Sequence, residues 1–538
     1  MKADLVLCAD TVHTMTDSDR PVEAVAVTAG VISAVGTRRD VRDWCGPGTE
    51  VVDLGRAVLT PGLVDGHLHP VAGLGLVADV DLSGARSPEE VHRLLADAAA
   101  SRAPDAWVQA WGLDPNVFRG RPLTGAPIET AVGGRPAFVR LFDAHSALVT
   151  PAALRIAGVD GHREFAQRST IVCGPDGRPT GLLLEASAME LVFDHVPREP
   201  VAVRAVKLQA LLDEMAATGL TGGHVMDLLG DSPEVIAAAE DLRDLPLRLR
   251  FAPWCDPGVD ADGIAELVAM QGRGGRRWAV GAVKFMIDGT IDNGTAWLEA
   301  PDTLGESTDS LWLDVHAYTR AVRTFAAAGV ATATHAIGDA AVRHVLDALD
   351  GAERSTTAPH RIEHIETLPS ALIDRFARQG VVASMQPTHC GFTKADHTDN
   401  WSARLGRERA DRAWRCRDLR DAGVPGVLGS DWPVAPVDAR RGLAEARLRR
   451  PAGEPGAPPV GPTQGLTARM ALEGYTSHAA LAAGEPGGGR IAVGGRADLT
   501  AFTLDPLRAD PDELAEAPIV LTVVGGAIVH SAAVTSVL

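Results

Sequence analysis

The sequence predicts an α/β protein: a TIM-like (β/α)8 barrel, a composite β-sandwich formed by both termini, and an α/β insertion after the first barrel strand. Strand-like and helix-like segments alternate through the middle of the 538-residue chain and give eight strands, most of them separated by helices. Both ends consist instead of short Val- and Ile-rich strands joined by turns. The alternation predicts the barrel, and the matching ends predict one shared sheet domain.

The composite β-sandwich is expected from residues 1–58 and 486–538. Its strands are expected at 3–7, 24–28 and 31–35 near the start, and at 497–502, 519–524 and 527–530 near the end. Ala29-Gly30 and Gly525-Gly526 are placed to turn hairpins between neighbouring strands. The two ends of the chain should therefore meet in space.

The barrel is expected to begin with residues 59–74, to be interrupted by an insertion subdomain over 75–200, and to continue over 201–485. Its strands are expected at 59–68, 222–226, 247–253, 279–287, 331–335, 361–365, 381–385 and 426–429. Helices are expected at 201–217, 233–243, 317–328, 340–350, 369–379 and 412–422. Residues 75–200 break this rhythm, which is why we assign them to an insertion.

Composition narrows the class of protein. Apolar residues make up 46% of the chain and charged residues 22%, which is typical of a folded globular protein. The net charge is −19 and no Lys/Arg block is present, so we expect no nucleic-acid partner. The N-terminal apolar run, broken by Asp10, is too short for a signal peptide or membrane span, and the six cysteines lack framework spacing. We therefore expect a cytoplasmic protein with no membrane partner, and leave a homodimer open.

The sharpest local feature is His67-Leu68-His69, at the end of the first barrel strand. Side chains two apart on a strand point to the same face, so the two imidazoles should project together. Active sites of such barrels lie at this C-terminal rim. Alone, however, a His-X-His pair is weak evidence for a metal site.

The ends of other barrel strands supply further metal ligands. Lys284 lies in the fourth strand, and His335, His364 and Asp431 end the fifth, sixth and eighth. A buried lysine is costly unless it is neutralised or paired. Carbamylated by CO2, it would present a carboxylate able to bridge two ions. With the two histidines of the first strand, this set can hold two divalent ions with water between them.

These motifs resemble the amidohydrolase superfamily, and in particular its N-substituted formamide deformylase-like subgroup (amidohydrolase family 3). The resemblance covers nearly the whole chain and is carried by residues 61–69 (PGLVDGHLH), 283–289 (VKFMIDG), 334–339 (THAIGD), 362–364 (IEH), 386–389 (QPTH), 429–433 (GSDWP) and 494–499 (GGRADL).

The resemblance implies a hydrolase with two divalent metal ions, expected to be zinc. His67 and His69 would bind the more buried ion with Asp431 nearby, His335 and His364 the second, and carbamylated Lys284 would bridge them. A metal-bound hydroxide would cleave a C–N bond, other than a peptide bond, in an amide or formamide-type small molecule. Asp431 would act as the general base and then as the general acid.

The sequence gives weaker signals for substrate contacts than for metal ligands. The resemblance suggests His145 and Glu185 in the insertion; the candidates at or just beyond strand ends are His224, Asp288, His389 and Trp432. A structural role remains open for each of them. The chain also departs from the subgroup at Gly294, where a basic residue usually precedes Thr-Ala, so substrate contacts from that loop are in doubt.

Three other functions are possible for such a chain. Mononuclear deaminases of the superfamily, which release ammonia from heterocycles, typically carry Glu three residues after the fifth-strand His, where this chain has Gly338. Ester or lactone hydrolysis could use the same site. A catalytically silent scaffold is disfavoured because every expected metal ligand is present. The substrate itself is not readable, and the insertion is expected to determine specificity.

Overall fold

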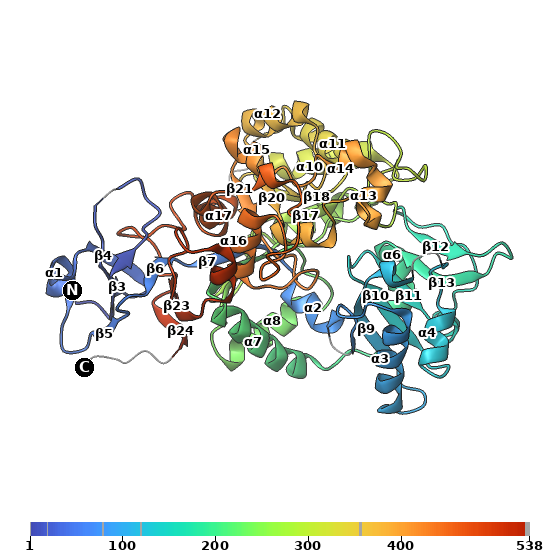
Figure 1. The fold of residues 1–538 in the computed structure, drawn as a ribbon, viewed down its shortest axis with the longest axis horizontal. Helices are drawn as coiled ribbons and strands as arrows, with labels where there is room; N and C mark the ends of the chain where they lie inside the picture. The colour runs from blue at the N-terminus through green and yellow to red at the C-terminus, as the bar shows by residue number, and fades with distance from the viewer. Residues whose placement is uncertain (1, 19, 78–79, 119–120, 354–357, 533–538) are drawn as a thin grey trace.

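The computed structural model describes residues 2–18, 20–77, 80–118, 121–353 and 358–532. The chain has an α/β fold in which a central body of strands and helices lies between two peripheral sheet regions (Figure 1). The described segments near both ends of the chain contribute to one peripheral region, and the segment that follows the first body strand forms the other. Across the described ranges, no helix has the length and apolar character needed to cross a lipid bilayer.

The central body contains two parallel sheets. The first has the order β16-β15-β14-β7 and the second β17-β18-β19-β20-β21. Their strands are β7 (Leu63–Leu68), β14 (Leu220–Val225), β15 (Arg248–Phe251), β16 (Trp278–Val280), β17 (Val283–Met286), β18 (Thr332–Ala336), β19 (Arg361–His364), β20 (Val382–Met385) and β21 (Gly426–Leu428). Single parallel bridges, Leu68 with Trp432 and Trp254 with Lys284, connect the two sheets. The arrangement is TIM-barrel-like.

Helices alternate with these strands and pack on them through apolar faces. They include α7 (Val201–Ala217), α8 (Ser232–Leu242), α9 (Ala261–Ala269), α10 (Val315–Ala327), α11 (Asp339–Leu349), α12 (Ser370–Gln379) and α15 (Cys416–Asp421). After β21 follow α16 (Ala439–Leu448), α17 (Ala468–Tyr475) and α18 (Ser477–Ala482). Helix α12 shows how local sequence sets an end, because Gly380 follows it in the left-handed conformation that favours glycine.

Two strands expected to be continuous are divided in the structure. The expected strand 59–68 is split at Gly62 into β6 (Val58–Pro61), which joins a peripheral sheet, and β7. A β-carbon on Gly62 would lie 2.3 Å from Thr221 Oγ1, so only glycine fits at this crossing. The expected strand 279–287 is split into β16 and β17, which belong to different parallel sheets. The apolar runs are real strands, but each changes its pairing partner along the way.

The two ends of the chain meet in a mixed sheet with the order β2-β6-β22-β23-β24, in which β6 pairs antiparallel with β22. Beside it lies a sheet with the order β4-β3-β1-β5. The strands are β1 (Leu5–Cys8), β2 (Thr11–Val12), β3 (Ala24–Thr28), β4 (Val31–Gly36), β5 (Glu50–Asp53), β22 (Leu499–Phe502), β23 (Ile519–Val524) and β24 (Ala527–Ser531). Leu7 and Val25 of one sheet share a hydrophobic cluster with Leu59 and Leu521 of the other. Residues 533–538 of the expected C-terminal part lie outside the described residues.

Most of the segment predicted as an insertion folds around its own six-stranded sheet, with the order β12-β13-β11-β10-β9-β8. Its strands are β8 (Val80–Asp81), β9 (Val108–Leu113), β10 (Ala137–Leu141), β11 (Ser146–Val149), β12 (Thr170–Cys173) and β13 (Pro179–Leu184). The helices are α3 (Pro88–Ala100), α4 (Ala126–Ala131), α5 (Pro151–Ile156) and α6 (Ala186–Phe193), and α2 (Pro70–Leu76) leads in from β7. Residues 78–79 and 119–120 lie outside the described residues.

Candidate metal centre and substrate cavity

The six residues predicted to hold metal line one cavity of about 480 Å³. They lie in, or within three residues after, the five strands β7, β17, β18, β19 and β21: His67, His69, Lys284, His335, His364 and Asp431. The ring centroids of His67 and His69 are 5.3 Å apart, those of His67 and His364 4.8 Å, and those of His335 and His364 4.4 Å. The structure thus brings together side chains that are up to 364 positions apart in the sequence.

His67 and His69 are held in matching orientations by carboxylates behind them. Nδ1 of His67 lies 2.7 Å from Glu363 Oε2, and Nδ1 of His69 lies 2.6 Å from Asp227 Oδ2. The opposite nitrogens converge, since the two Nε2 atoms lie 3.4 Å and 3.2 Å from Asp431 Oδ1. A carboxylate on one ring nitrogen fixes the tautomer and leaves the other nitrogen to ligate a metal.

Asp431 lies at the centre of this group. Burial alone would raise its pKa, but His67 and His69 hold the pKa below its ordinary value, so the carboxyl is ionised. Its backbone has a φ of 59°, a left-handed conformation rare for residues other than glycine. His364, Glu185 and Ala144 at the same site also have positive φ. Strained conformations of this kind cluster where function requires a fixed geometry.

The remaining two histidines are buried and neutral. Burial holds the pKa of both His335 and His364 well below the ordinary value, and neighbouring cationic groups add to this effect. Nδ1 of His364 lies 3.0 Å from Gln386 Oε1, and Nε2 of His335 lies 3.3 Å from the carbonyl oxygen of Gly289. Neutral imidazole is the form that binds metals, so both side chains are ready to ligate.

Lys284 is 1% exposed, and no hydrogen bond or ion pair of its ammonium group is found among the described residues. Burial lowers its pKa to about 8, although Glu363 and Asp431 act in the opposite direction. The neutral amine is therefore much more populated near neutral pH than in an ordinary lysine, at about a tenth of the side chain at pH 7. An unpaired ammonium at this depth is costly, which points to a chemical role rather than a structural one.

The donor set fits divalent metal ions. Two groups of described residues bring possible ligand atoms within 4.8 Å of one another: His67, His69 and Asp431, and His364, His389 and Asp431. His389 was predicted as a substrate contact, and its Nε2 is buried without a partner. Imidazole nitrogen and carboxylate oxygen together suit zinc and similar ions.

A second, smaller cavity of about 50 Å³ adjoins the first. The residues that line both cavities include His145, His335, His364 and Asp431. The rest of the small cavity's wall includes the aromatic side chains Phe142, Phe392, Trp401 and Trp414. Burial raises the pKa of two acids in this wall, Asp292 to about 7 and Glu366 to about 8. The candidate metal ligands therefore lie where the large cavity meets the small one.

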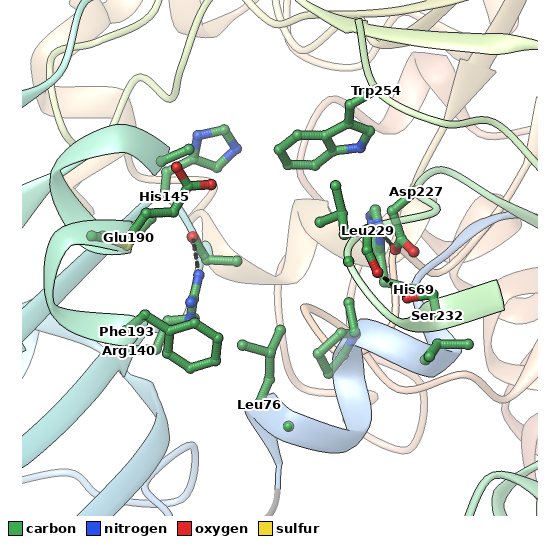
Figure 2. Close-up of a pocket in the computed structure, with 18 of the residues that line it drawn as sticks. His69, Leu76, Arg140, His145, Glu190, Phe193, Asp227, Leu229, Ser232 and Trp254 are labelled. Carbon is green, nitrogen blue, oxygen red and sulfur yellow. Dashed lines mark hydrogen bonds and ion pairs between the residues drawn. The ribbon is translucent and has the colours of Figure 1, made fainter. Parts of the chain in front are cut away.

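Two of the predicted substrate residues reach the cavity from the insertion. Nδ1 of His145 lies 2.9 Å from Glu185 Oε2, and its ring centroid is 5.0 Å from that of His335. Burial alone would lower the pKa of His145, but Glu185 and Asp143 raise it to about 9. His145 is therefore cationic at neutral pH; it lies next to His335 and faces His69 across the large cavity (Figure 2).

The insertion is fixed in this position by polar contacts that the sequence did not indicate. Asp143 accepts a hydrogen bond from Thr290 Oγ1 at 2.9 Å and a shorter one from Asn293 Nδ2. Ser146 Oγ lies 3.2 Å from Asn293 Oδ1. The loop that follows β17 thus binds the turn between β10 and β11, which carries His145.

Three other predicted substrate residues, His224, Asp288 and Trp432, do not line either cavity. His224 is buried, and Arg361 Nη1 donates to its Nδ1 at 2.8 Å. Asp288 accepts backbone N–H groups after β18, and Trp432 packs on α2, where a β-carbon on Gly73 would lie 2.2 Å from its ring. Contacts between these three residues and a substrate remain predictions.

Several residues important to the site were missed in the sequence. Asp227 and Trp254 follow the ends of β14 and β15, and Glu363 directly precedes His364. The signal available was their position at strand ends, but acids and aromatics are common there.

Gly294, where the subgroup has a basic residue, has φ 71°, and a β-carbon would lie 2.7 Å from Arg404 Nη1. The guanidinium of Arg404 occupies the space beside the loop.

Comparison with known proteins agrees with this geometry. Residues 50–530 match the model of the amidohydrolase family. The chain is 30% identical over 531 residues to YtcJ of Bacillus subtilis (strain 168), whose name assigns it to the amidohydrolases, with 96% of this chain and 98% of that protein covered. It is 26% identical to N-substituted formamide deformylase of Arthrobacter pascens, with 98% of each covered.

Among solved structures, an uncharacterized metal-dependent hydrolase from Pyrococcus horikoshii OT3 shares the fold. Its TM-score is 0.73 at 21% sequence identity, with 94% of this chain and 99% of that chain covered. The family match covers far more than half of the chain, and the predicted ligand residues lie together in one cavity. The chain is therefore an enzyme of the amidohydrolase family.

Proposed function

We propose that this enzyme hydrolyses the C–N bond of a small amide or formamide at a centre of two divalent metal ions, with zinc as the preferred metal. The two parallel sheets would form one (β/α)8 barrel, and the sheets of the two termini one β-sandwich. His67 and His69 would hold one ion, His335 and His364 the other, and Lys284, carbamylated by CO2, would bridge them, with Asp431 beside both.

One observation carries this proposal. Nε2 of His67 and Nε2 of His69 converge on Asp431 Oδ1 while carboxylates hold their Nδ1 atoms, and the partnerless Lys284 lines the same cavity. His69 and Asp431 can pair directly without an ion, but Lys284 has no such pair among the described residues. A purely structural cluster would not leave a buried amine of this kind without a hydrogen bond.

A divalent ion bound here would polarise the substrate carbonyl and lower the pKa of coordinated water. Carbamylation suits Lys284 because its lowered pKa, about 8, supplies neutral amine. The amine nitrogen would bond to the carbon of CO2 and lose one proton, which leaves an anion in place of a cation. The bridging role would account for a lysine buried without a partner.

Asp431 would move the proton. Its carboxylate is ionised because the neighbouring histidines hold its pKa down, so it can accept a proton from the attacking water. The same oxygen would return that proton to the leaving amine nitrogen. Its left-handed backbone and the hydrogen bond from its N–H to the His67 carbonyl oxygen, 2.7 Å long, keep the carboxylate in position.

The two adjoining cavities suggest how a substrate would lie. The cavity of about 50 Å³ has room for a formyl or other small acyl group, since one water takes about 30 Å³ of liquid volume. The cavity of about 480 Å³ has room for a much larger amine part. This asymmetry supports an amide with a small acyl group on a sizeable amine.

Heterocycle deamination is less well supported. The superfamily's mononuclear deaminases place a glutamate where this chain has Gly338. At this position a β-carbon would lie 2.0 Å from the carbonyl oxygen of Trp297, so no such side chain fits. Ester or lactone hydrolysis would use the same residues as amide hydrolysis, so matched ester probes are included in the test.

The test is a metal analysis combined with a substrate screen. The protein, supplied with zinc and bicarbonate, would be offered N-formyl and N-acetyl amines, the corresponding formate esters, and aminopurines, with amine, alcohol or ammonia measured as product. We expect about two bound ions per chain and amine release, loss of both after chelation, and loss of amine release in Asp431→Asn. Activity that survives complete removal of metal would overturn the proposal.

A further inference from the structure

Arg140 on β10 is a cation in the wall of the large cavity, and among the described residues it forms no ion pair with an acid. Its Nη1 donates to the carbonyl oxygen of Ala144 at 3.1 Å, and its Nε is buried without an acceptor. Within the described part of the chain, no carboxylate lies within ion-pair distance of this guanidinium. Most of its five N–H groups are therefore left without an acceptor.

The other arginines in this wall are different. Arg204 Nη1 lies 2.7 Å from Asp231 Oδ1, and Arg198 Nη2 lies 3.4 Å from Asp194 Oδ1. Both have an acid on the protein, whereas Arg140 is held by aromatic rings, with its guanidinium carbon 5.4 Å from the Phe138 centroid and 5.3 Å from that of Phe193. The ring contacts fix the guanidinium in place without neutralising it.

We infer that Arg140 binds a carboxylate on the amine part of the substrate, so that the preferred substrates are N-acyl amines that carry an anionic group. This inference rests on the proposed function, because it assumes that the amine part occupies the large cavity. A planar guanidinium with free N–H groups matches a carboxylate in a two-bonded arrangement. Arg140 would thus be a specificity residue contributed by the insertion.

The apolar side chains of the large cavity favour substrates in which an apolar linker separates the scissile bond from the carboxylate. Figure 2 shows Arg140 and Phe193 on one side of the cavity, Trp254 and Leu229 on the other, and Leu76 of α2 beside them. An ion pair between Arg140 and a substrate carboxylate would be stronger here than in water, because the apolar side chains displace water and lower the local dielectric constant.

Several acids also line this space, and two of them, Asp143 and Glu190, act on Arg140: burial lowers the pKa of its guanidinium to about 10, and both carboxyls oppose that shift. Burial raises the pKa of Asp143, of Glu190 and of Asp256, another acid of the wall, which favours their protonated forms. A carboxylate bound to Arg140 would therefore meet less repulsion from these acids than their formal charges suggest.

The test compares three probes that differ at one group: N-formylphenylalanine, its amide, and N-formyl-2-phenylethylamine. 6-(Formylamino)hexanoate and N-formylpentylamine repeat the comparison with a longer arm. Wild-type enzyme should favour the carboxylate probe of at least one pair in kcat/KM. In Arg140→Gln this preference should fall about ten- to hundredfold, as expected for a hydrogen bond to a charged group, with neutral probes changed less than about threefold.

Arg204→Gln is the matched control, because its guanidinium lines the same cavity but is bound to Asp231. It should leave the preference unchanged. If Arg140→Gln lowers kcat/KM equally for charged and neutral probes, or lowers Tm without changing the preference, Arg140 has a structural role and the inference is wrong. It is also wrong if wild-type enzyme favours the neutral probe of both pairs.

A binding measurement separates this inference from the proposed function. If no probe is hydrolysed, the proposed function fails, but calorimetric binding of 3-phenylpropionate still tests Arg140. Weaker binding to Arg140→Gln than to the wild type and to Arg204→Gln, by about tenfold, would support the carboxylate site. Equal binding to all three proteins would overturn it.

Discussion

Glu363 Oε2 lies 2.7 Å from His67 Nδ1 and accepts a hydrogen bond from Arg361 Nη2 at 3.0 Å. All three side chains are buried. Burial alone would raise the pKa of Glu363, but Arg361 and His67 hold it well below its ordinary value. The carboxylate therefore stays ionised, keeps the proton of His67 on Nδ1, and leaves Nε2 free for a metal.

Glu363→Gln should weaken metal binding although it removes no ligand. The amide cannot hold the His67 tautomer as firmly, and it leaves Arg361 without its charge partner. We expect metal affinity to fall about ten- to hundredfold, measured by competition with a chromogenic chelator. Glu445→Gln, a buried acid of α16 away from both cavities, should leave metal affinity unchanged. Unaltered metal affinity in Glu363→Gln would show that the carboxylate does not support the ligand.

Replacing Lys284 should abolish activity, and added short carboxylates should restore part of it in Lys284→Ala but not in Lys284→Met. Lys284→Ala leaves a space beside the metal cluster that acetate or propionate can enter, whereas in Lys284→Met the side chain fills it. We expect both variants to lose activity at least about a hundredfold, and short carboxylates to restore part of it in Lys284→Ala only. Activity and metal content would be measured with and without added acetate. Wild-type activity in Lys284→Met would contradict the carbamate role.

Phe392→Ala should widen the range of acyl groups that the enzyme accepts. Phe392 lines the small cavity and packs on Phe142, with ring centroids 5.0 Å apart. Its removal makes room for additional methylenes, each worth about 10- to 200-fold in discrimination. The measured quantity is the ratio of kcat/KM for N-butyryl and N-formyl derivatives of one amine, which should rise at least about tenfold. Phe193→Ala, which enlarges the other cavity, should not change this ratio, and an equal rise in both variants would argue against a separate acyl site.

Asp292→Asn should change how stability depends on pH. Burial raises the pKa of Asp292 from its ordinary value near 4 to about 7, so the folded protein binds a proton that the unfolded chain releases within this range. Wild-type stability should therefore fall as pH rises from about 4 to about 7. The asparagine keeps the acceptor oxygen for Asn400 Nδ2, which donates to Asp292 Oδ1 at 2.9 Å, but does not titrate.

The measurement is the Tm of both proteins across that pH range. The advantage of Asp292→Asn should grow with pH and level off above about 7, at a value on the order of a few kcal/mol. Taking the difference between the proteins cancels the other buried acids, such as Glu366. A constant difference in Tm from pH 4 to 8 would mean that Asp292 ionises normally in the folded protein.

Much of the fold could be predicted from sequence because local pattern decides it. The helix expected at 201–217 and the strand expected at 519–524 appear with the same bounds in α7 and β23. The divisions at Gly62 and between β16 and β17 could not be predicted. An apolar run looks the same whether it pairs with one sheet or passes from one to the next.

The sequence by itself determined that this chain carries six candidate metal ligands in or just after predicted barrel strands, because strand periodicity depends on nearby residues: His67, His69, Lys284, His335, His364 and Asp431. Only the tertiary structure decided which other side chains lie next to these residues. Glu363 contacts His67 from another strand, His145 comes from a separate sheet, and Arg140 forms no ion pair among the described residues. Such contacts join residues far apart in the chain, and no local pattern records which partners packing will place within hydrogen-bond distance.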